Sequence, residues 1–236
     1  NLFTVTVVDT TAPVITLLGI DPVTIEAGSA YVDAGATAAD NINGDITGAI
    51  TNTSTVNTAV LGFYTIIYAV NDSAGNAASA VRNVSIVDTT LPNITLLGST
   101  PITVEVGNAY TDAGATALDN YDGNITASII TVNPVNTSAL GTYTITYNVN
   151  DSSGNTAATV TRTVNVVDTT PPVITMLGPT PITVEADSAY ADAGATALDN
   201  YDGNITASIT AVNPVNTSAL GTYTVTYNVN DSSGNA

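Results

Sequence analysis

The sequence predicts an all-β protein made of three tandem β-sandwich domains. A stretch of about 80 residues recurs three times, and each copy opens with a Val-Asp-Thr-Thr-x-Pro motif. Within each copy, apolar residues alternate with polar ones, which is the pattern of a strand with one buried and one exposed face. No segment repeats its apolar residues at the 3.6-residue period of an amphipathic helix.

The opening motifs divide the chain into repeats. Their aspartates are Asp9, Asp88 and Asp168, and the expected domains are 9–87, 88–167 and 168–236. Residues 1–8 match the segment 160–167 that closes the second repeat, so we expect them to form an unpaired strand outside the first domain. The third repeat stops before that segment, and we therefore expect the third sandwich to lack its last strand.

The strands of a sandwich can be followed in order along the second repeat. A short strand is expected at 125–132, and a longer one at 142–150, where Tyr, Ile and Val alternate with Thr and Asn. An Asp-Ser-Ser-Gly-Asn turn joins it to a strand at 159–167, which makes a hairpin. The third repeat adds short strands at 173–177 and 181–185. Six or seven such strands in about 80 residues favour a sandwich.

The composition excludes several classes of function. The chain has 20 acidic residues, two arginines and no Cys, Lys or His. A serine nucleophile would lack its usual base and a metal would lack thiolate and imidazole ligands, so we expect no enzymatic activity. The negative charge opposes binding to nucleic acid and anionic membranes. No apolar run approaches the ~18 residues of a spanning helix, so we expect no membrane insertion.

Several motifs resemble those of a known family. Leu-Gly-Thr-Tyr at 140–143 resembles the tyrosine corner of immunoglobulin-like folds, and Tyr64 and Tyr223 stand in similar motifs; a core tyrosine without that hydrogen bond is the alternative. The third repeat also contains Asp168-Thr-Thr-Pro-Pro, Ile182-Thr-Val-Glu185, Tyr190-Ala-Asp-Ala-Gly and Asp199-Asn-Tyr-Asp-Gly. With these motifs the whole chain resembles the bacterial immunoglobulin-like (Ig-like) repeats named after a pesticidal crystal protein, which are relatives of hyalin-repeat domains.

The resemblance implies three tandem Ig-like sandwiches that serve as spacers or stalks in large extracellular proteins. A Thr-rich, Lys-free, acidic and repetitive composition is likewise typical of secreted surface proteins. We therefore expect an extracellular location at a cell surface.

Aspartates in three parts of each repeat predict calcium sites. The turn before the last strand of a sandwich lies at the same end as the linker that opens the domain, and the Asp-Asn-x-(Asp/Asn)-Gly loop can converge there too, as in cadherin-like junctions. Calcium prefers carboxylate and carbonyl oxygens. The candidate ligands are Asp9, Asp40, Asp45, Asp72, Asn76, Asp88, Asp119, Asp122, Asp151, Asn155, Asp168, Asp199, Asp202, Asp231 and Asn235.

A second interpretation of these aspartates stays open. Asp-Gly and Ser-x-Gly-Asn are common turn sequences, in which Asp and Asn bond to their own backbone and Gly takes a positive φ. In that case the acidic residues shape turns and hold no metal.

Residues 1–8 predict assembly by strand exchange. The segment would dock antiparallel to the exposed strand of a preceding copy, with Phe3 at the position that Arg162 occupies in the second domain. This contact propagates head to tail into a fibre of identical chains. The expected assembly residues are Leu2, Phe3, Val5 and Val7 on one side and Tyr223, Val225 and Tyr227 on the other.

Two alternative functions stay open. The chain can be a stalk segment of a giant covalent cell-surface adhesin, in which case the fibre is one polypeptide. It can also be a carbohydrate-binding module, with Tyr121 and Tyr201 stacking on a surface glycan.

Arg82 and Arg162 are the only basic residues. Each falls on a predicted last strand, and we expect partly exposed cross-strand ion pairs with Glu26 and Glu105. Removing such a pair would cost about 1 kcal/mol or less.

Overall fold

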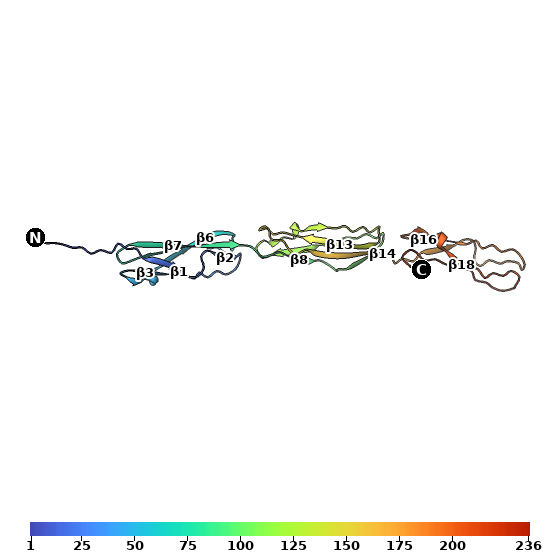
Figure 1. The fold of residues 1–236 in the computed structure, drawn as a ribbon. Helices are drawn as coiled ribbons and strands as arrows, with labels where there is room; N and C mark the ends of the chain where they lie inside the picture. The colour runs from blue at the N-terminus through green and yellow to red at the C-terminus, as the bar shows by residue number, and fades with distance from the viewer. The chain divides into compact units, whose positions relative to one another are not determined.

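The computed structural model describes all 236 residues, and its regular elements are 19 strands and three short 3-10 turns (Figure 1). No helix in it is long and apolar enough to cross a membrane. The strands form three repeated units, which we call modules 1, 2 and 3 after the three sequence repeats. The predicted all-β fold of three Ig-like units is confirmed, and the third unit has fewer strands than the others.

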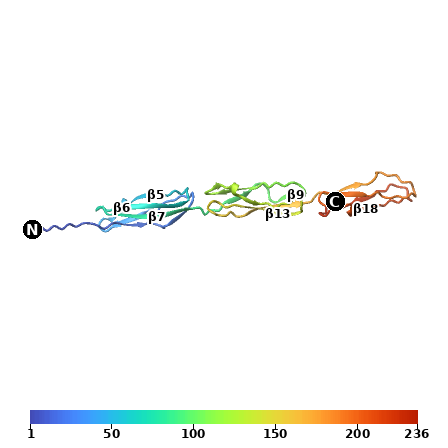
Figure 2. The same ribbon diagram turned by 90° about the horizontal axis from the view of Figure 1, so that it is seen from above.

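Module 1 contains two sheets. The first has the order β1-β3-β4 and consists of β1 (Val14–Leu17), β3 (Ala36–Asp40) and β4 (Gly44–Asp45). The second has the order β2-β7-β6-β5 and consists of β2 (Val23–Glu26), β5 (Thr51–Ser54), β6 (Gly62–Asn71) and β7 (Ala77–Val87). Strand β2 runs parallel to β7, whereas β5, β6 and β7 are antiparallel neighbours. Figure 2 shows β5, β6 and β7 together in module 1.

Module 2 repeats this arrangement. One sheet consists of β8 (Asn93–Leu96), β10 (Ala115–Asp119) and β11 (Gly123–Asn124), and the other of β9 (Ile102–Glu105), β12 (Ile130–Val132), β13 (Gly141–Asn148) and β14 (Val160–Val167). The antiparallel pair of β13 and β14 confirms the predicted hairpin. The strand predicted at 125–132 is only partly right, because a 3-10 turn at Thr126–Ser128 precedes β12.

Module 3 has five strands: β15 (Val173–Met176), β16 (Ala195–Asp199), β17 (Gly203–Asn204), β18 (Thr210–Val212) and β19 (Thr226–Asn228). The strand predicted at 181–185 does not form. In modules 1 and 2 the equivalent strands β2 and β9 pair with the last strand, and no strand takes that place beside 181–185. The result is a groove of about 580 Å³, whose lining includes Ile182, Tyr223 and Val225.

The core of module 1 lies between its two sheets and follows the alternation of the sequence. In β6, Ile66, Tyr68 and Val70 point inward and are buried, as are Val84 and Ile86 of β7. The residues between them face solvent. Burial of apolar surface, which contributes a favourable free energy of about 25 cal/mol for each Å², is the main source of stability for such a sandwich.

The tyrosine corner is confirmed in all three modules. The hydroxyl of Tyr64 donates a hydrogen bond to the carbonyl oxygen of Val60 at 2.8 Å. Tyr143 and Tyr223 donate equivalent bonds to Ala139 and Ala219, each at 3.0 Å. A tyrosine hydroxyl that bonds to the backbone a few residues upstream is characteristic of Ig-like sandwiches.

The expected pairing of the arginines is wrong. Arg82 and Arg162 are 1% and 0% exposed, and they pair with Asp33 and Asp112 rather than with Glu26 and Glu105. The parallel register places Glu105 beside Val167, five residues beyond Arg162. Arg162 instead points into the core, where its Nη2 donates to the carbonyl oxygens of Leu97 and Gly114.

Candidate metal centres

Three chain segments meet at the linker end of each module. They are the linker Asp-Thr-Thr motif, the loop that follows β3, β10 or β16, and the Asp-Ser-x-Gly-Asn turn, which lies inside the final hairpin in modules 1 and 2 and follows β19 in module 3. Each segment brings an aspartate with it. The three resulting clusters are Asp9, Asp40 and Asp72 in module 1, Asp88, Asp122 and Asp151 in module 2, and Asp168, Asp199 and Asp231 in module 3.

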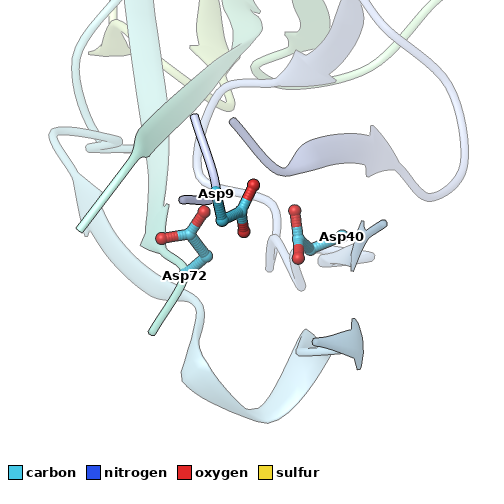
Figure 3. A group of neighbouring side chains, drawn as sticks. All are labelled: Asp9, Asp40 and Asp72. Atoms are coloured by element: carbon cyan, nitrogen blue, oxygen red, sulfur yellow. The ribbon is translucent and has the colours of Figure 1, made fainter. Parts of the chain in front are cut away.

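The module 1 cluster is compact and largely closed off from solvent. Asp9, Asp40 and Asp72 each offer a carboxylate oxygen, and these oxygens lie within 4.8 Å of one another. Figure 3 shows Asp9 between the other two side chains. Asp40 and Asp72 are each only 8% exposed. Three carboxylates at this spacing repel one another strongly unless a proton or a cation lies between them.

The loop after β3 orients Asp40. Its Oδ1 accepts hydrogen bonds from the backbone N–H groups of Ile42 and Asn43, at 2.9 and 2.8 Å. Its Oδ2 is buried and has no hydrogen-bond partner. A buried oxygen without a partner is costly for an aspartate, and the cluster is where a ligand would satisfy it.

The same loop recurs in the other modules. Asp119 and Asp199 each accept two backbone N–H bonds through Oδ1, and their Oδ2 atoms are also buried without partners. One free oxygen is therefore held toward the linker end in every module. The repetition favours a shared role over a local accident.

The hairpin turn fixes the second aspartate of each cluster. Asp72 accepts backbone N–H bonds from Ala74 and Asn76 through Oδ1. The Asn76 side chain donates to Asp72 Oδ2 at 2.7 Å and, more weakly, to the linker carbonyls of Asp9 and Thr11. Asn155 and Asn235 make the equivalent bonds in modules 2 and 3. These asparagines thus tie the turn to the linker through their amide nitrogens.

In module 2 the loop contributes Asp122 to the cluster, whereas the equivalent loops of modules 1 and 3 contribute Asp40 and Asp199. Asp122 accepts bonds from the backbone N–H and the hydroxyl of Ser152, at 2.6 and 2.7 Å. Asp202 contacts Ser232 in the same way in module 3, and Asn43 contacts Ser73 in module 1. These contacts join the loop to the Asp-Ser-x-Gly-Asn turn in each module.

The linker carboxylates are held in surroundings that disfavour their charge. Burial raises the pKa of Asp88 and of Asp168, and the nearby carboxylates of Asp119 and Asp199 act in the same direction. Burial also acts to raise the pKa of Asp72 and Asp231, but hydrogen bonds from Asn76 and Asn235 outweigh it and lower the pKa of both. A cation would offset the cost of ionising the linker aspartates.

Three predicted carboxylate ligands, Asp45, Asp119 and Asp202, are not members of the three clusters. Asp45 is exposed on β4 and accepts a backbone N–H bond from Thr47 at 2.9 Å. Asn124 and Asn204 accept the same bond in the other modules. Tyr201, considered as a sugar-stacking residue, is 40% exposed, and its backbone N–H bonds to Asp199.

Sequence reasoning missed the serines and glutamates around these clusters. The hydroxyls of Ser153 and Ser233 donate to Asp88 and Asp168, and the carboxylates of Glu26 and Glu105 hold the linker threonines. A glutamate stands at a similar distance before the linkers at Asp88 and Asp168, and this repeated spacing was the signal that could have revealed the glutamate–threonine contact.

The donor set suits a hard divalent cation. Only oxygen ligands are present, and calcium takes six to eight of them, including carboxylates, carbonyls and water. The turn-forming interpretation is also correct in part, because Asp40, Asp119 and Asp199 each use one oxygen for their own loop, and Asp72 uses both of its oxygens for its turn. The two roles are compatible, since the other carboxylate oxygen of Asp40, Asp119 and Asp199 remains free.

Comparison with known proteins gives a consistent family. The profile described as "Bacterial surface protein, Ig-like domain" matches residues 15–86, 94–166 and 174–236. Hyalin of Strongylocentrotus purpuratus is 30% identical over 74% of this chain and 15% of its own length. An uncharacterized 81.3 kDa protein of Acholeplasma phage L2 is 31% identical over 83% of this chain and 28% of its own.

The pesticidal crystal protein Cry22Aa of Bacillus thuringiensis is 30% identical over 89% of this chain and 31% of its own length. The chain thus spans less than a third of each of these relatives.

Proposed function

The chain belongs to the bacterial surface protein Ig-like domain family, and from that premise we propose that it is a structural spacer of an extracellular, cell-surface array whose linkers are stiffened by calcium. The proposal has two parts. The three tandem Ig-like modules supply length, and the aspartate clusters supply a cation site where each linker enters its module.

The observation that carries the calcium proposal is the module 1 cluster. Asp40 is 8% exposed, one of its oxygens has no hydrogen-bond partner, and that side chain belongs to a triad of carboxylates within 4.8 Å. Burying such a group without a counter-charge is costly. A divalent cation would satisfy the free oxygen and offset the repulsion, and it would join the linker to two loops of the module.

The test is metal analysis combined with thermal unfolding. Extracellular calcium modules typically have dissociation constants of ~10⁻⁴–10⁻³ M, so a few millimolar calcium would add roughly 1–2 kcal/mol per site. We expect elemental analysis to find calcium after equilibration, and EDTA to lower the melting temperature. An identical melting curve with and without EDTA, and no bound metal, would leave only the turn-forming role.

Strand exchange is a second candidate function, favoured by the exposed apolar residues of segment 1–8 and by the groove of module 3. Leu2, Phe3 and Val7 are more than 90% exposed, and the groove of module 3 is lined in part by Tyr223, Val225 and Tyr227. Docking of residues 1–8 of one copy into the groove of another would cover both. Removal of residues 1–8 should then abolish any fibres, and fibres that persist in that variant would contradict strand exchange.

A carboxylate without a cationic partner in the groove of module 3 bears on which strand fits there. Asp192 occupies the place that Asp112 has in module 2, and it receives hydrogen bonds from Tyr227 and from the Gly194 backbone but has no arginine partner. Docking of residues 1–8 puts Phe3 where Arg162 lies in module 2. A strand that carries arginine at that position matches the groove better, because it supplies the missing charge.

A further inference from the structure

One glutamate in each of modules 1 and 2 faces the linker that leaves that module. Glu26 is the last residue of β2, and the parallel register places it beside Val87, directly before Asp88. Glu105 is the last residue of β9 and lies beside Val167, directly before Asp168. Each carboxylate therefore lies next to the Asp-Thr-Thr motif.

The glutamate binds both threonines of that motif. Glu26 accepts from the backbone N–H of Thr89 at 3.0 Å and from that of Thr90 at 3.1 Å. The hydroxyls of the same two threonines donate to it at 2.8 and 2.7 Å. Its two oxygens thus take up four donors from two consecutive residues. That geometry fixes the backbone of the linker as well as its side chains.

Glu105 repeats the contact in module 2. It accepts from the backbone N–H of Thr169 at 3.0 Å and from the hydroxyls of Thr169 and Thr170, each at 2.8 Å. The pKa of each glutamate falls to about 2, and the largest cause is the hydroxyl of Thr90 for Glu26 and of Thr169 for Glu105. Both carboxylates are therefore ionised at neutral pH.

The held segment also carries a residue of the next aspartate cluster. Asp88 precedes Thr89 directly, and the backbone N–H of Thr90 donates both to Glu26 and, at 3.3 Å, to Asp88 Oδ1. The other Asp88 oxygen accepts from Ser153, beside Asp122 and Asp151. The same two-residue distance separates Asp168 from Thr170. Movement of the linker would thus displace a ligand of the cluster.

We propose that Glu26 and Glu105 are positioning residues for the cation sites at Asp88 and Asp168, and that cation binding and linker anchoring strengthen each other. This inference rests on the proposed calcium function and identifies residues that set the calcium affinity of two of the proposed cation sites. Pre-ordering of the linker lowers the entropy cost of bringing the aspartate to the cation. By linkage, a bound cation must stabilise the glutamate–threonine contacts by the same factor.

Two variants separate the effect of the glutamate–threonine hydrogen bonds from the effect of the negative charge of Glu26 on calcium binding. Glu26→Gln keeps the shape of the side chain but removes its charge and one acceptor oxygen. The double variant Thr89→Val and Thr90→Val removes the two hydroxyl donors and leaves every charge in place. If anchoring matters, both variants weaken calcium binding at Asp88. A fall of about fivefold is expected, at the low end of the range typical of coupled sites.

Each site has its own reporter in the full chain. Gly75, Gly154 and Gly234 lie in the three Asp-Ser-x-Gly-Asn turns, and their backbone N–H groups donate to the carbonyl oxygens of Asp72, Asp151 and Asp231. Their amide NMR signals, followed during a calcium titration, give three separate midpoints. In both module 1 variants we expect only the Gly154 midpoint to rise, with Gly75 and Gly234 as internal controls. Glu105→Gln should raise the Gly234 midpoint instead.

Three outcomes decide the matter. An unchanged Gly154 midpoint in both variants would overturn the inference while leaving the calcium sites intact. A rise in Glu26→Gln alone would assign the effect to charge and would equally overturn it. If none of the three glycines responds to calcium in the unaltered chain, both the inference and the proposed calcium function fail.

Discussion

Arg162 and Asp112 form an ion pair inside module 2, between β14 and the segment that precedes β10. Arg162 lies on β14 and is 0% exposed, and Asp112 lies just before β10 with a side chain that is 14% exposed. Tyr147 and Tyr110 donate to the same carboxylate. Burial acts to raise the pKa of Asp112, but the bond from Tyr147 and the charge of Arg162 outweigh it and lower the pKa.

Replacement of Arg162 by alanine should strongly destabilise module 2. The change leaves the Asp112 charge buried without its partner and removes the donor to Leu97 and Gly114, so we expect a loss of about 3–5 kcal/mol. Denaturant unfolding of the full chain measures it, and Arg162→Lys should be intermediate because lysine lacks the planar fork. A loss below about 1 kcal/mol would contradict the burial of the pair.

This pair shows where sequence reasoning stopped. The hairpin was predictable because Tyr143, Ile145 and Tyr147 alternate with threonines. The same alternation puts Arg162 at an inward position together with Val164 and Val166, and that signal was available. Its partner was not, because Asp112 lies outside the strands, 50 residues away in the segment before β10, and no local pattern pairs residues that far apart in the sequence.

The aspartate clusters were predictable for a related reason. Strand parity in a sandwich determines which turns share an end, so Asp9 and Asp72 could be brought together from the sequence alone. The choice of ligand within the loop could not be derived in the same way. Asp45 lies outside the cluster and accepts a hydrogen bond from the backbone N–H of Thr47. Which aspartate of the loop joins the cluster depends on such hydrogen bonds, and these are specific to the folded loop.

Replacement of Asp40 by asparagine should have opposite effects on the melting temperature in the absence and in the presence of calcium. The new amide oxygen can still accept the Ile42 and Asn43 backbone bonds, so the loop survives while one cluster charge disappears. In EDTA we expect the Asp40→Asn variant to melt at or above the unaltered chain, because carboxylate repulsion is relieved. In a few millimolar calcium it should melt lower, because a ligand charge is lost.

Asp45→Asn is the matched control for that experiment. It removes a charge from the same module but outside the cluster, and asparagine occupies the equivalent position in modules 2 and 3. Calcium should stabilise this variant as much as the unaltered chain. Equal calcium responses of Asp40→Asn and Asp45→Asn would argue against a site at Asp40.

The contribution of Glu105 to stability should depend on pH. Its pKa is about 2 in the folded chain, against 4.5 for an ordinary glutamate, so the folded state favours the ionised form. The stabilisation is fully present above the ordinary pKa and is lost as pH falls from about 4.5 to 2. In calcium-free buffer, the difference in unfolding free energy between the unaltered chain and Glu105→Gln should shrink over that range. A difference that stays constant down to pH 2 would contradict the anchoring of the linker by an ionised carboxylate.

The groove of module 3 should discriminate between peptides by charge. A peptide with the sequence of 159–167 carries arginine at the position that faces Asp192, whereas a peptide of residues 1–8 carries phenylalanine there. Since the partly buried carboxylate of Asp192 has no cationic partner, we expect the arginine peptide to bind more tightly to the full chain in fluorescence anisotropy. Asp192→Asn should weaken the arginine peptide and leave the phenylalanine peptide little changed. Tighter binding of the peptide of residues 1–8 would instead favour strand exchange by that segment, with apolar burial outweighing the unpaired carboxylate.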